Sequence, residues 1–165
     1  EPGVPSGIQV AVDRFVTTGT HYARPPTAAP MQFRVLGPDA GGPATPDLRR
    51  LFRGQRLTAA RRNRLDRGGR ILAIRGNRVV GLAAYERTDR EVRVYELVVD
   101  PDSASGTDEN VGGLLDALEL ACLAGGARRL LLLPRAACAA TLLRLRGYAA
   151  FGHGPAGPWF EKTFA

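Results

Sequence analysis

The chain has 165 residues and 44% hydrophobic content, which suits one domain with a buried core and is too short for two full domains. No run of about 18 apolar residues is present. The N-terminal "EPGVPSGIQV" has neither the basic nor the apolar segment of a signal peptide, so the sequence points to no membrane. The formal net charge of +7 leaves an acidic or nucleic-acid partner open.

The first 30 residues are rich in Pro, Gly, Thr and Ala, and we interpret them as an extension or linker before a domain at residues 31–165. The chain begins at Glu1 rather than Met, which suggests a segment of a longer protein. Its two cysteines, Cys122 and Cys138, each lie within an apolar helical pattern, which predicts buried, reduced thiols. We therefore expect a cytoplasmic protein.

The domain opens with a predicted strand, "MQFRVLG" at residues 31–37, followed by two predicted helices. Leu48, Leu51, Phe52 and Gln55, at i, i+3, i+4 and i+7, predict an amphipathic helix over residues 45–55, with Thr45 as its N-cap and Pro46 at its first position. A second short helix is predicted from Thr58.

Arginines are concentrated in this helical region, at positions Arg49, Arg50, Arg53, Arg56, Arg61, Arg62, Arg64, Arg67 and Arg70. The simplest interpretation is a solvated helix face whose arginine stems lie over the core. The alternative is a site for an acidic substrate or for nucleic acid. No aromatic residues lie between these arginines, which argues against nucleic acid.

The middle of the chain predicts an antiparallel meander of three strands. Two β-prone runs flank Gly76 and Asn77, a pair that can adopt the positive φ of a tight hairpin turn, and "EVRVYELVV" at residues 91–99 follows a second turn. A loop then leads into a helix whose apolar stripe consists of Val111, Leu114, Leu115, Leu118 and Cys122. We expect that helix to end at Gly125 and Gly126.

The C-terminal part continues with "RRLLLLP", whose consecutive leucines are typical of a parallel strand covered on both faces. Together with the preceding strand and helix it predicts a βαβ crossover. Residues 136–146 predict a last helix, ended by Gly147. The runs "YAAF" and "WFEKTF" predict a closing hairpin around a loop at residues 152–158.

This order of elements resembles the GNAT superfamily of N-acyltransferases over residues 31–165. The resemblance rests on "ELVVDP", "NVGGLLDALE", "RLLLLP" and "LLRLRGY". It implies an α/β (α+β) fold: a mixed central sheet in which an antiparallel meander precedes the βαβ crossover, with helices on both faces. It also implies an acetyl-CoA-dependent N-acetyltransferase that acts on a primary amine by direct attack of the amine on the thioester.

In that family a Q/R-x-x-G-x-G/A loop wraps the coenzyme A pyrophosphate at the start of a helix, where free amides and the helix dipole favour an anion. Here the pattern falls on Thr107, Asn110 and Gly112, and the resemblance adds Val111 and Gly113 to the implied cofactor-binding residues. The loop has no basic residue. Asp108 and Glu109 would repel a pyrophosphate, or they simply cap the helix and complement its dipole.

The resemblance also implies catalytic residues. Glu96 matches the base that takes a proton from the amine; strict alternation puts it on the apolar face of Val92, Val94 and Val98, where desolvation raises a carboxyl pKa. A structural glutamate bonded to a neighbouring strand is the alternative.

The backbone amides of Leu97, Val98 and Val99 match those that bind pantetheine, and the Val98 or Val99 N–H matches the donor to the thioester carbonyl.

The family's general acid is a tyrosine, but its position here holds Leu143, and Ala136 replaces an asparagine that contacts pantetheine. Tyr148 and Tyr95 are the nearby candidates for the acid, of which we select Tyr148; packing residues are the alternative for both. No group of His, Cys, Asp or Glu has metal-binding spacing, so no metal is predicted.

Three functions remain open from the sequence. The first is the N-acetyltransferase, with a small-molecule or protein amine as acceptor; an arginine-rich helix pair favours an acidic one. The second is a catalytically degenerate GNAT-like regulatory or interaction domain of a larger protein, favoured by the losses at Thr107, Asn110 and Leu143. The third is a basic nucleic-acid binder. A homodimer is left open.

Overall fold

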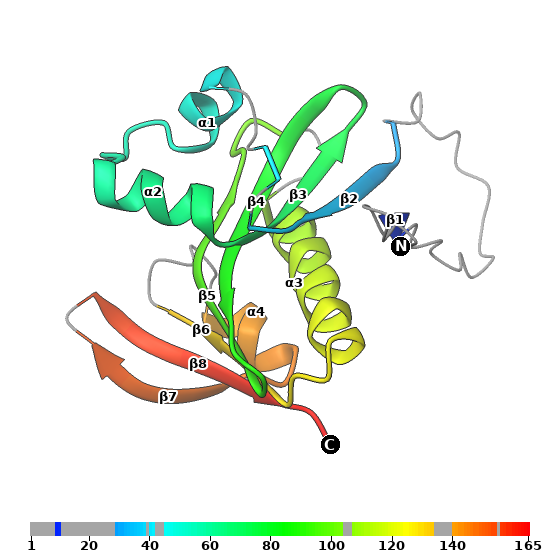
Figure 1. The fold of residues 1–165 in the computed structure, drawn as a ribbon, viewed down its shortest axis with the longest axis vertical. Helices are drawn as coiled ribbons and strands as arrows, with labels where there is room; N and C mark the ends of the chain where they lie inside the picture. Colours follow the sequence, from blue (N-terminus) through cyan, green and yellow to red (C-terminus); the bar gives the residue numbers. More distant parts are fainter. Residues whose placement is uncertain are drawn as a thin grey trace, which may run out of the picture.

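The computed structural model describes residues 9–10, 29–38, 40–41, 45–103, 107–133, 140–154 and 156–165, with backbone alone for 9–10 and 45. Within these residues the chain forms one sheet flanked by helices (Figure 1). The strands are β1 (Gln9–Val10), β2 (Met31–Leu36), β3 (Gly69–Arg75), β4 (Arg78–Arg87), β5 (Glu91–Val99), β6 (Arg129–Leu132), β7 (Ala149–Gly154) and β8 (Gly157–Thr163). The helices are α1 (Thr45–Leu51), α2 (Ala59–Arg67), α3 (Thr107–Ala124) and α4 (Ala140–Leu145).

The described strands lie in the order β1-β2-β3-β4-β5-β6-β8-β7. Strands β2 to β5 pair antiparallel, and β5 pairs parallel with β6, so the predicted meander and βαβ crossover are confirmed. The closing hairpin places its second strand, β8, against β6 and leaves β7 outermost among the described strands. The β1–β2 pair links residues 9–10 to this sheet.

Helices cover both faces of the sheet, as predicted, and each face has its own core. On one face α3 presents its apolar stripe, from Val111 to Cys122, to β3, β4, β5 and β6. On the other face α1 contributes Leu48 and Leu51, the turn after it contributes Phe52, and α2 contributes Leu65 to a second core. The large side chains removed from water on both faces supply the main stabilisation of the fold.

Two predicted boundaries were wrong. Helix α1 ends at Leu51 rather than at residue 55, because the chain turns at Gly54, whose φ of 75° a helix cannot accommodate. The loop predicted at residues 152–158 is shorter, since β7 runs to Gly154 and β8 begins at Gly157. The start of the second helix was right: the Thr58 side chain accepts a hydrogen bond from the Arg61 N–H at 3.2 Å.

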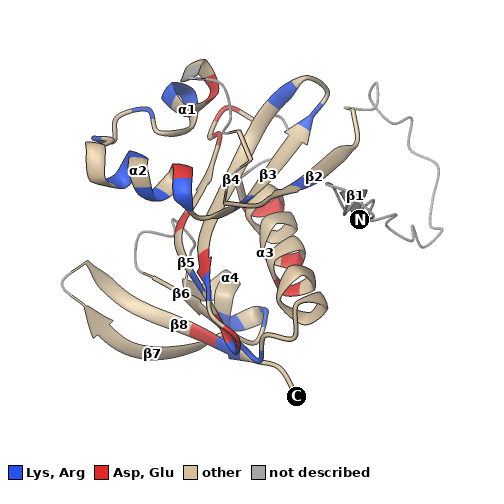
Figure 2. Cartoon of the chain, viewed as in Figure 1, with Lys and Arg blue, Asp and Glu red and all other residues tan. Residues whose placement is uncertain are grey.

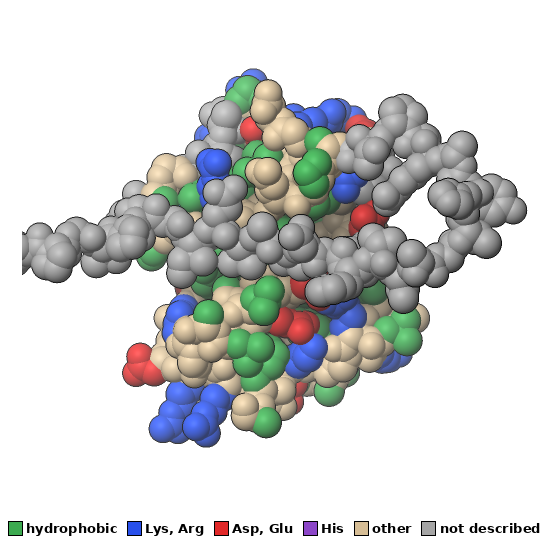
Figure 3. All heavy atoms as spheres, turned by 90° about the vertical axis from the view of Figure 1, so that its right-hand side faces the viewer, with side chains coloured by type: hydrophobic (Ala, Val, Ile, Leu, Met, Phe, Trp, Pro, Cys, Tyr) green, Lys and Arg blue, Asp and Glu red, His purple; other side chains and the backbone are tan. Residues whose placement is uncertain are grey.

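Figure 3 shows the side of the molecule that lies to the right in Figure 1, where hydrophobic and charged side chains are interspersed. Within the described part of the chain no helix is both long and apolar enough to cross a bilayer. Cys122 is buried and unbridged, as predicted, whereas Cys138 lies outside the described residues.

Candidate active site

The second half of β5 is the feature around which the site is built. The ladder between β5 and β6 pairs Glu91–Val94 with Arg129–Leu132, and its last bond runs from the Leu133 N–H to the Val94 carbonyl at 2.9 Å. Strand β4, in contrast, accompanies β5 as far as Val99. Beyond Val94, therefore, no strand in the described part of the chain pairs with this edge of β5.

Backbone alternation determines which amides face the open edge. The Asp100 N–H donates to the Val80 carbonyl at 2.8 Å, on the β4 side. Because N–H directions alternate along an extended strand, the Val98 N–H also points toward β4, whereas those of Leu97 and Val99 point toward the edge that β6 has left. Of the three amides predicted to bind the cofactor, those of Leu97 and Val99 face the opening and that of Val98 does not. Val99 is therefore the one of the two predicted donors to the thioester carbonyl that faces this edge.

A β-bulge sets the orientation of Glu96. Ala84 pairs with Glu96 and Tyr85 with Val94, so Tyr95 is an extra residue on β5. The bulge shifts the alternation of side chains, and Glu96 therefore lies on the α2 face. The prediction that Glu96 shares a face with Val92 and Val94 was wrong, because both pack in the α3 core. The predicted shared face with Val98 holds, since Val98 packs on the α1–α2 face.

The surroundings of Glu96 are not purely apolar. Its side chain is 3% exposed, and the Arg61 guanidinium donates to both carboxylate oxygens, with 2.7 Å from Nη2 to Oε2. The same Nη2 donates to the Gln55 Oε1 at 2.9 Å, and the guanidinium carbon lies 5.1 Å from the centre of the Phe52 ring. The bond to Glu96 is the main cause of the raised pKa of Arg61. The pair fastens α2 to β5 and positions a carboxylate on this face.

The first turn of α3 contributes the second part of the candidate site. Thr107 is exposed, whereas Asn110, Val111 and Gly112 are buried. The two glycines have different surroundings. A Cβ on Gly113 would lie 2.6 Å from the Phe33 ring of β2, so this glycine gives room for packing within the protein rather than for a ligand. A Cβ on Gly112 would meet only the Arg146 Nη1, at 3.6 Å.

Arg146 is a site residue that the sequence interpretation missed. It follows α4, and its side chain, 24% exposed, reaches α3 beside Gly112 and forms an ion pair with Asp116. Its buried Nε makes no hydrogen bond to the described residues. The loop before α3 has no basic residue, yet a guanidinium lies next to the first turns of the helix. The sequence signal, Arg146 within "LLRLRGY", indicates a charge but not its position in space.

Tyr148 lies on the opposite face of the sheet from Glu96. It is buried in the α3 core, where its hydroxyl donates to the Glu119 Oε1 at 2.9 Å and Lys162 Nζ lies 5.4 Å from the ring centre. Burial first, and then the Glu119 charge, raises the pKa of Tyr148 above its ordinary value. Leu143 packs in the same core. The structure thus does not bring the two predicted catalytic side chains together.

Tyr95 was the other candidate for the general acid. The Tyr95 hydroxyl donates to the Arg64 carbonyl at 2.6 Å, and desolvation raises the pKa of this tyrosine to about 12. It packs between β5 and α2 on the Glu96 face. No group of metal-ligating side chains occurs among the residues that the structure describes, and Ala136 lies outside them.

No protein-family model and no curated protein matches this sequence. Solved structures do match. N-acetylglutamate synthase from Neisseria gonorrhoeae, complexed with coenzyme A and N-acetyl-glutamate, has a TM-score of 0.63 at 13% identity over 84% of this chain and 36% of its own. A GNAT family acetyltransferase from Elizabethkingia anophelis with acetyl-CoA bound has a TM-score of 0.58 at 12% identity over 80% of this chain and 98% of its own. At these identities the likeness shows a shared fold.

Proposed function

Because the chain has the fold of the GNAT acetyltransferases, we propose that it is an acetyl-CoA-dependent N-acetyltransferase acting on a primary amine. The observation that carries this proposal is the open edge of β5, where the Leu97 and Val99 amides face away from β4. Two such N–H donors can bind an extended amide chain and stabilise the oxyanion that forms when an amine attacks a thioester. This chemistry needs only the backbone, so it tolerates side-chain divergence.

The first turn of α3 and Arg146 would hold the phosphates of the coenzyme, which supplies the activated acetyl group when bound. Helix α3 has 18 residues and begins at Thr107, and the positive end of its dipole favours an anion there. Gly112 leaves space for close approach, and Arg146 supplies the cation that the loop lacks. Asp108 and Glu109 are exposed and oppose binding by repulsion that salt screens.

Glu96 is the proposed base, and its bond to Arg61 defines the condition for that role. With both oxygens accepting from the guanidinium, the carboxylate takes a proton from an amine only if one of these bonds lengthens. The role of Tyr148 as general acid stays a prediction from the sequence, and its place in the α3 core, bonded to Glu119, does not favour that role. Direct attack of the amine forms the C–N bond, breaks the C–S bond and releases the coenzyme thiolate.

The proposal is tested by calorimetric titration with acetyl-CoA and by release of the coenzyme thiol in the presence of amines. We expect saturable binding that weakens about tenfold in Arg146→Gln, the effect of losing one charge-assisted hydrogen bond. Arg144→Gln is the matched control, since Arg144 is an exposed residue of α4 whose side chain forms no hydrogen bond or ion pair with the described residues. No heat at millimolar acetyl-CoA would exclude the enzyme.

A second candidate is a catalytically degenerate regulatory or interaction domain. It is favoured by one observation: both oxygens of the Glu96 carboxylate accept hydrogen bonds from Arg61. It predicts acetyl-CoA binding without turnover on any amine. In either case we propose that residues 31–165 form the functional domain and residues 1–30 an extension. A cytoplasmic location and a homodimer stay predictions from the sequence.

A further inference from the structure

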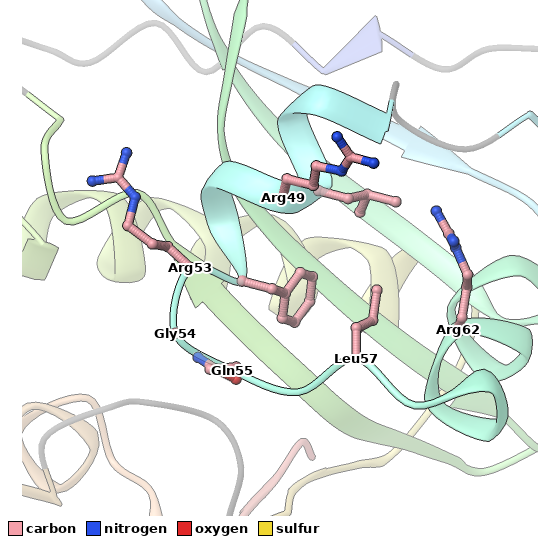
Figure 4. A pocket seen from close by; sticks show the side chains of 8 residues that line it. Arg49, Arg53, Gly54, Gln55, Leu57 and Arg62 are labelled. Carbon is pink, nitrogen blue, oxygen red and sulfur yellow. The ribbon is translucent and has the colours of Figure 1, made fainter.

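A cavity of about 420 Å³ lies between α1, α2 and the segment that joins them (Figure 4). Its apolar lining consists of Leu48, Phe52 and Leu57, of which the first two are buried and the third is half-buried. This volume falls in the range of small-molecule pockets, roughly 300–1,000 Å³. The cavity can therefore enclose the hydrocarbon part of a small ligand.

The other lining side chains are mainly cationic. Figure 4 shows Arg49 and Arg62 extending from α1 and α2 toward the same side of the cavity, with Arg53 on the opposite side. Arg53 forms an exposed ion pair with Asp102 at 3.2 Å. Arg49 and Arg62 are exposed, and their side chains form no hydrogen bond or ion pair with any residue that the structure describes. Among the described lining residues none is acidic.

The carboxylates of Asp47 and Asp100 are paired with other arginines rather than with these two. Figure 2 shows basic residues on both α1 and α2. Asp47 pairs with Arg50 at 2.6 Å, and Asp100 is shared by Arg50 at 3.0 Å and Arg78 at 2.7 Å. The positive charge of Arg49 and Arg62 is thus available to a ligand, and an apolar surface beside two guanidinium groups suits a carboxylate with a short hydrocarbon chain.

We propose that this cavity binds the carboxylate end of the acceptor, so that the substrate is a primary amine that also carries a carboxylate and an apolar segment. The role of the ligand as acceptor rests on the proposed N-acetyltransferase function. The cavity is close to β5, because two of its lining residues, Phe52 and Gln55, contact Arg61, which binds Glu96. The Arg61 guanidinium thus connects the lining of the cavity to the strand that carries the proposed base.

The first experiment measures binding without acetyl-CoA, by NMR titration of the full chain with hexanoate and, as neutral isostere, hexanamide. We expect hexanoate to bind at least tenfold more tightly and to lose affinity as NaCl is raised. Arg49→Gln and Arg62→Gln should each weaken hexanoate about tenfold. Arg90→Gln is the matched control, since it removes an exposed arginine at the turn before β5 with the same change in net charge. Circular dichroism checks that the variants remain folded.

Equal binding of hexanoate and hexanamide would overturn the inference, and so would an equal loss in Arg90→Gln and Arg62→Gln. The second experiment compares 6-aminohexanoate with hexylamine as acceptors at saturating acetyl-CoA; a lower KM for the amino acid, lost in Arg62→Gln with little change in kcat, supports it. If hexanoate binds as expected but acetyl-CoA does not bind, the proposed enzyme fails while the carboxylate site stands. If acetyl-CoA binds and hexanoate does not, only the carboxylate site fails.

Discussion

The Arg61–Glu96 pair is the contact whose removal has the most predictable consequence. Glu96 is 3% exposed and the Arg61 side chain 11%, so solvent screens neither partner well. Removing one partner of a buried ion pair typically costs about 3–5 kcal/mol. We expect this full cost for Arg61→Met, which leaves a buried carboxylate without its cation. Glu96→Gln keeps the side-chain shape and one acceptor oxygen, and we expect about 2–3 kcal/mol.

The double variant tests whether these costs come from the interaction itself. Arg61→Met with Glu96→Gln leaves no buried charge, so its loss of stability should be about 3 kcal/mol smaller than the sum of the single losses. Urea unfolding, followed by circular dichroism and by the fluorescence of Trp159, gives each free energy of unfolding. The surface pair is the control: Arg53→Gln, at a contact whose side chains are 68% and 60% exposed, should change stability by less than about 1 kcal/mol. Losses that add within about 0.5 kcal/mol would refute the reasoning.

The same variants separate a catalytic Glu96 from a structural one. If the carboxylate is the base, Glu96→Gln lowers kcat by about 10²- to 10⁴-fold at a temperature where the variant is folded. Arg61→Met keeps the carboxylate and should retain most of the activity of the folded fraction. Equal losses of kcat in both variants would assign Glu96 to the support of α2 rather than to proton transfer.

Three further predictions concern α3 and its core. Gly113→Ala pushes a methyl group against the β2 ring and should cost about 1–3 kcal/mol in urea unfolding. Gly112→Ala makes only an ordinary contact and should instead raise stability by up to about 1 kcal/mol, because alanine is the better helix former; equal effects would contradict the packing. Tyr148→Phe removes the bond to Glu119 and should lower stability by about 1 kcal/mol while changing kcat less than twofold; a loss of about 10²-fold would instead make Tyr148 the general acid. Burial raises the pKa of the Cys122 thiol from 9.0 to about 12. The folded state therefore keeps its full stability below pH 9 and loses free energy of unfolding as the pH rises toward 12, because the unfolded chain gives up the thiol proton first. Between pH 9 and 10 the free energy of unfolding should fall by up to about 1.4 kcal/mol more than in Cys122→Ala, and parallel plots of stability against pH for the two proteins would refute the shift.

Local sequence signals predicted most of the fold because they act over a few residues. Gly76, Gly126 and Gly147 have φ values of 60°, 72° and 82°, and each lies where a hairpin turn or helix end was predicted. The apolar stripe of α3 is buried throughout, as its helical spacing indicates. The four leucines after residue 129 form, in part, the parallel strand that their two-sided apolar pattern predicts.

The candidate site was predicted less well because its geometry depends on register and on distant contacts. One inserted residue, Tyr95, moves Glu96 to the other face of the sheet, and nothing in "VYELVV" distinguishes a bulged strand from a regular one. The partner of Glu96, Arg61, is 35 residues away on α2, and the sequence does not show which arginine of that helix would reach the carboxylate. Gly113 was predicted to make room for a ligand, but it instead makes room for the ring of Phe33, which lies in β2 near the N-terminal end of the domain in sequence.

The charge of the α3 loop shows the same limit in another form. Between Val98 and Glu119 the sequence has acidic residues and no basic one, and a motif of local residues therefore argues against a phosphate. Electrostatic energy depends on distance in space, however, and Arg146 lies beside Gly112 although it is 34 positions away in sequence. A cation provided by a different element contributes to the potential as a residue of the loop would. The absence of a basic residue from the loop is therefore weak evidence against a phosphate site. The affinity of Arg146→Gln for acetyl-CoA, relative to that of Arg144→Gln, measures how far the Arg146 guanidinium takes the place of a basic residue in the loop.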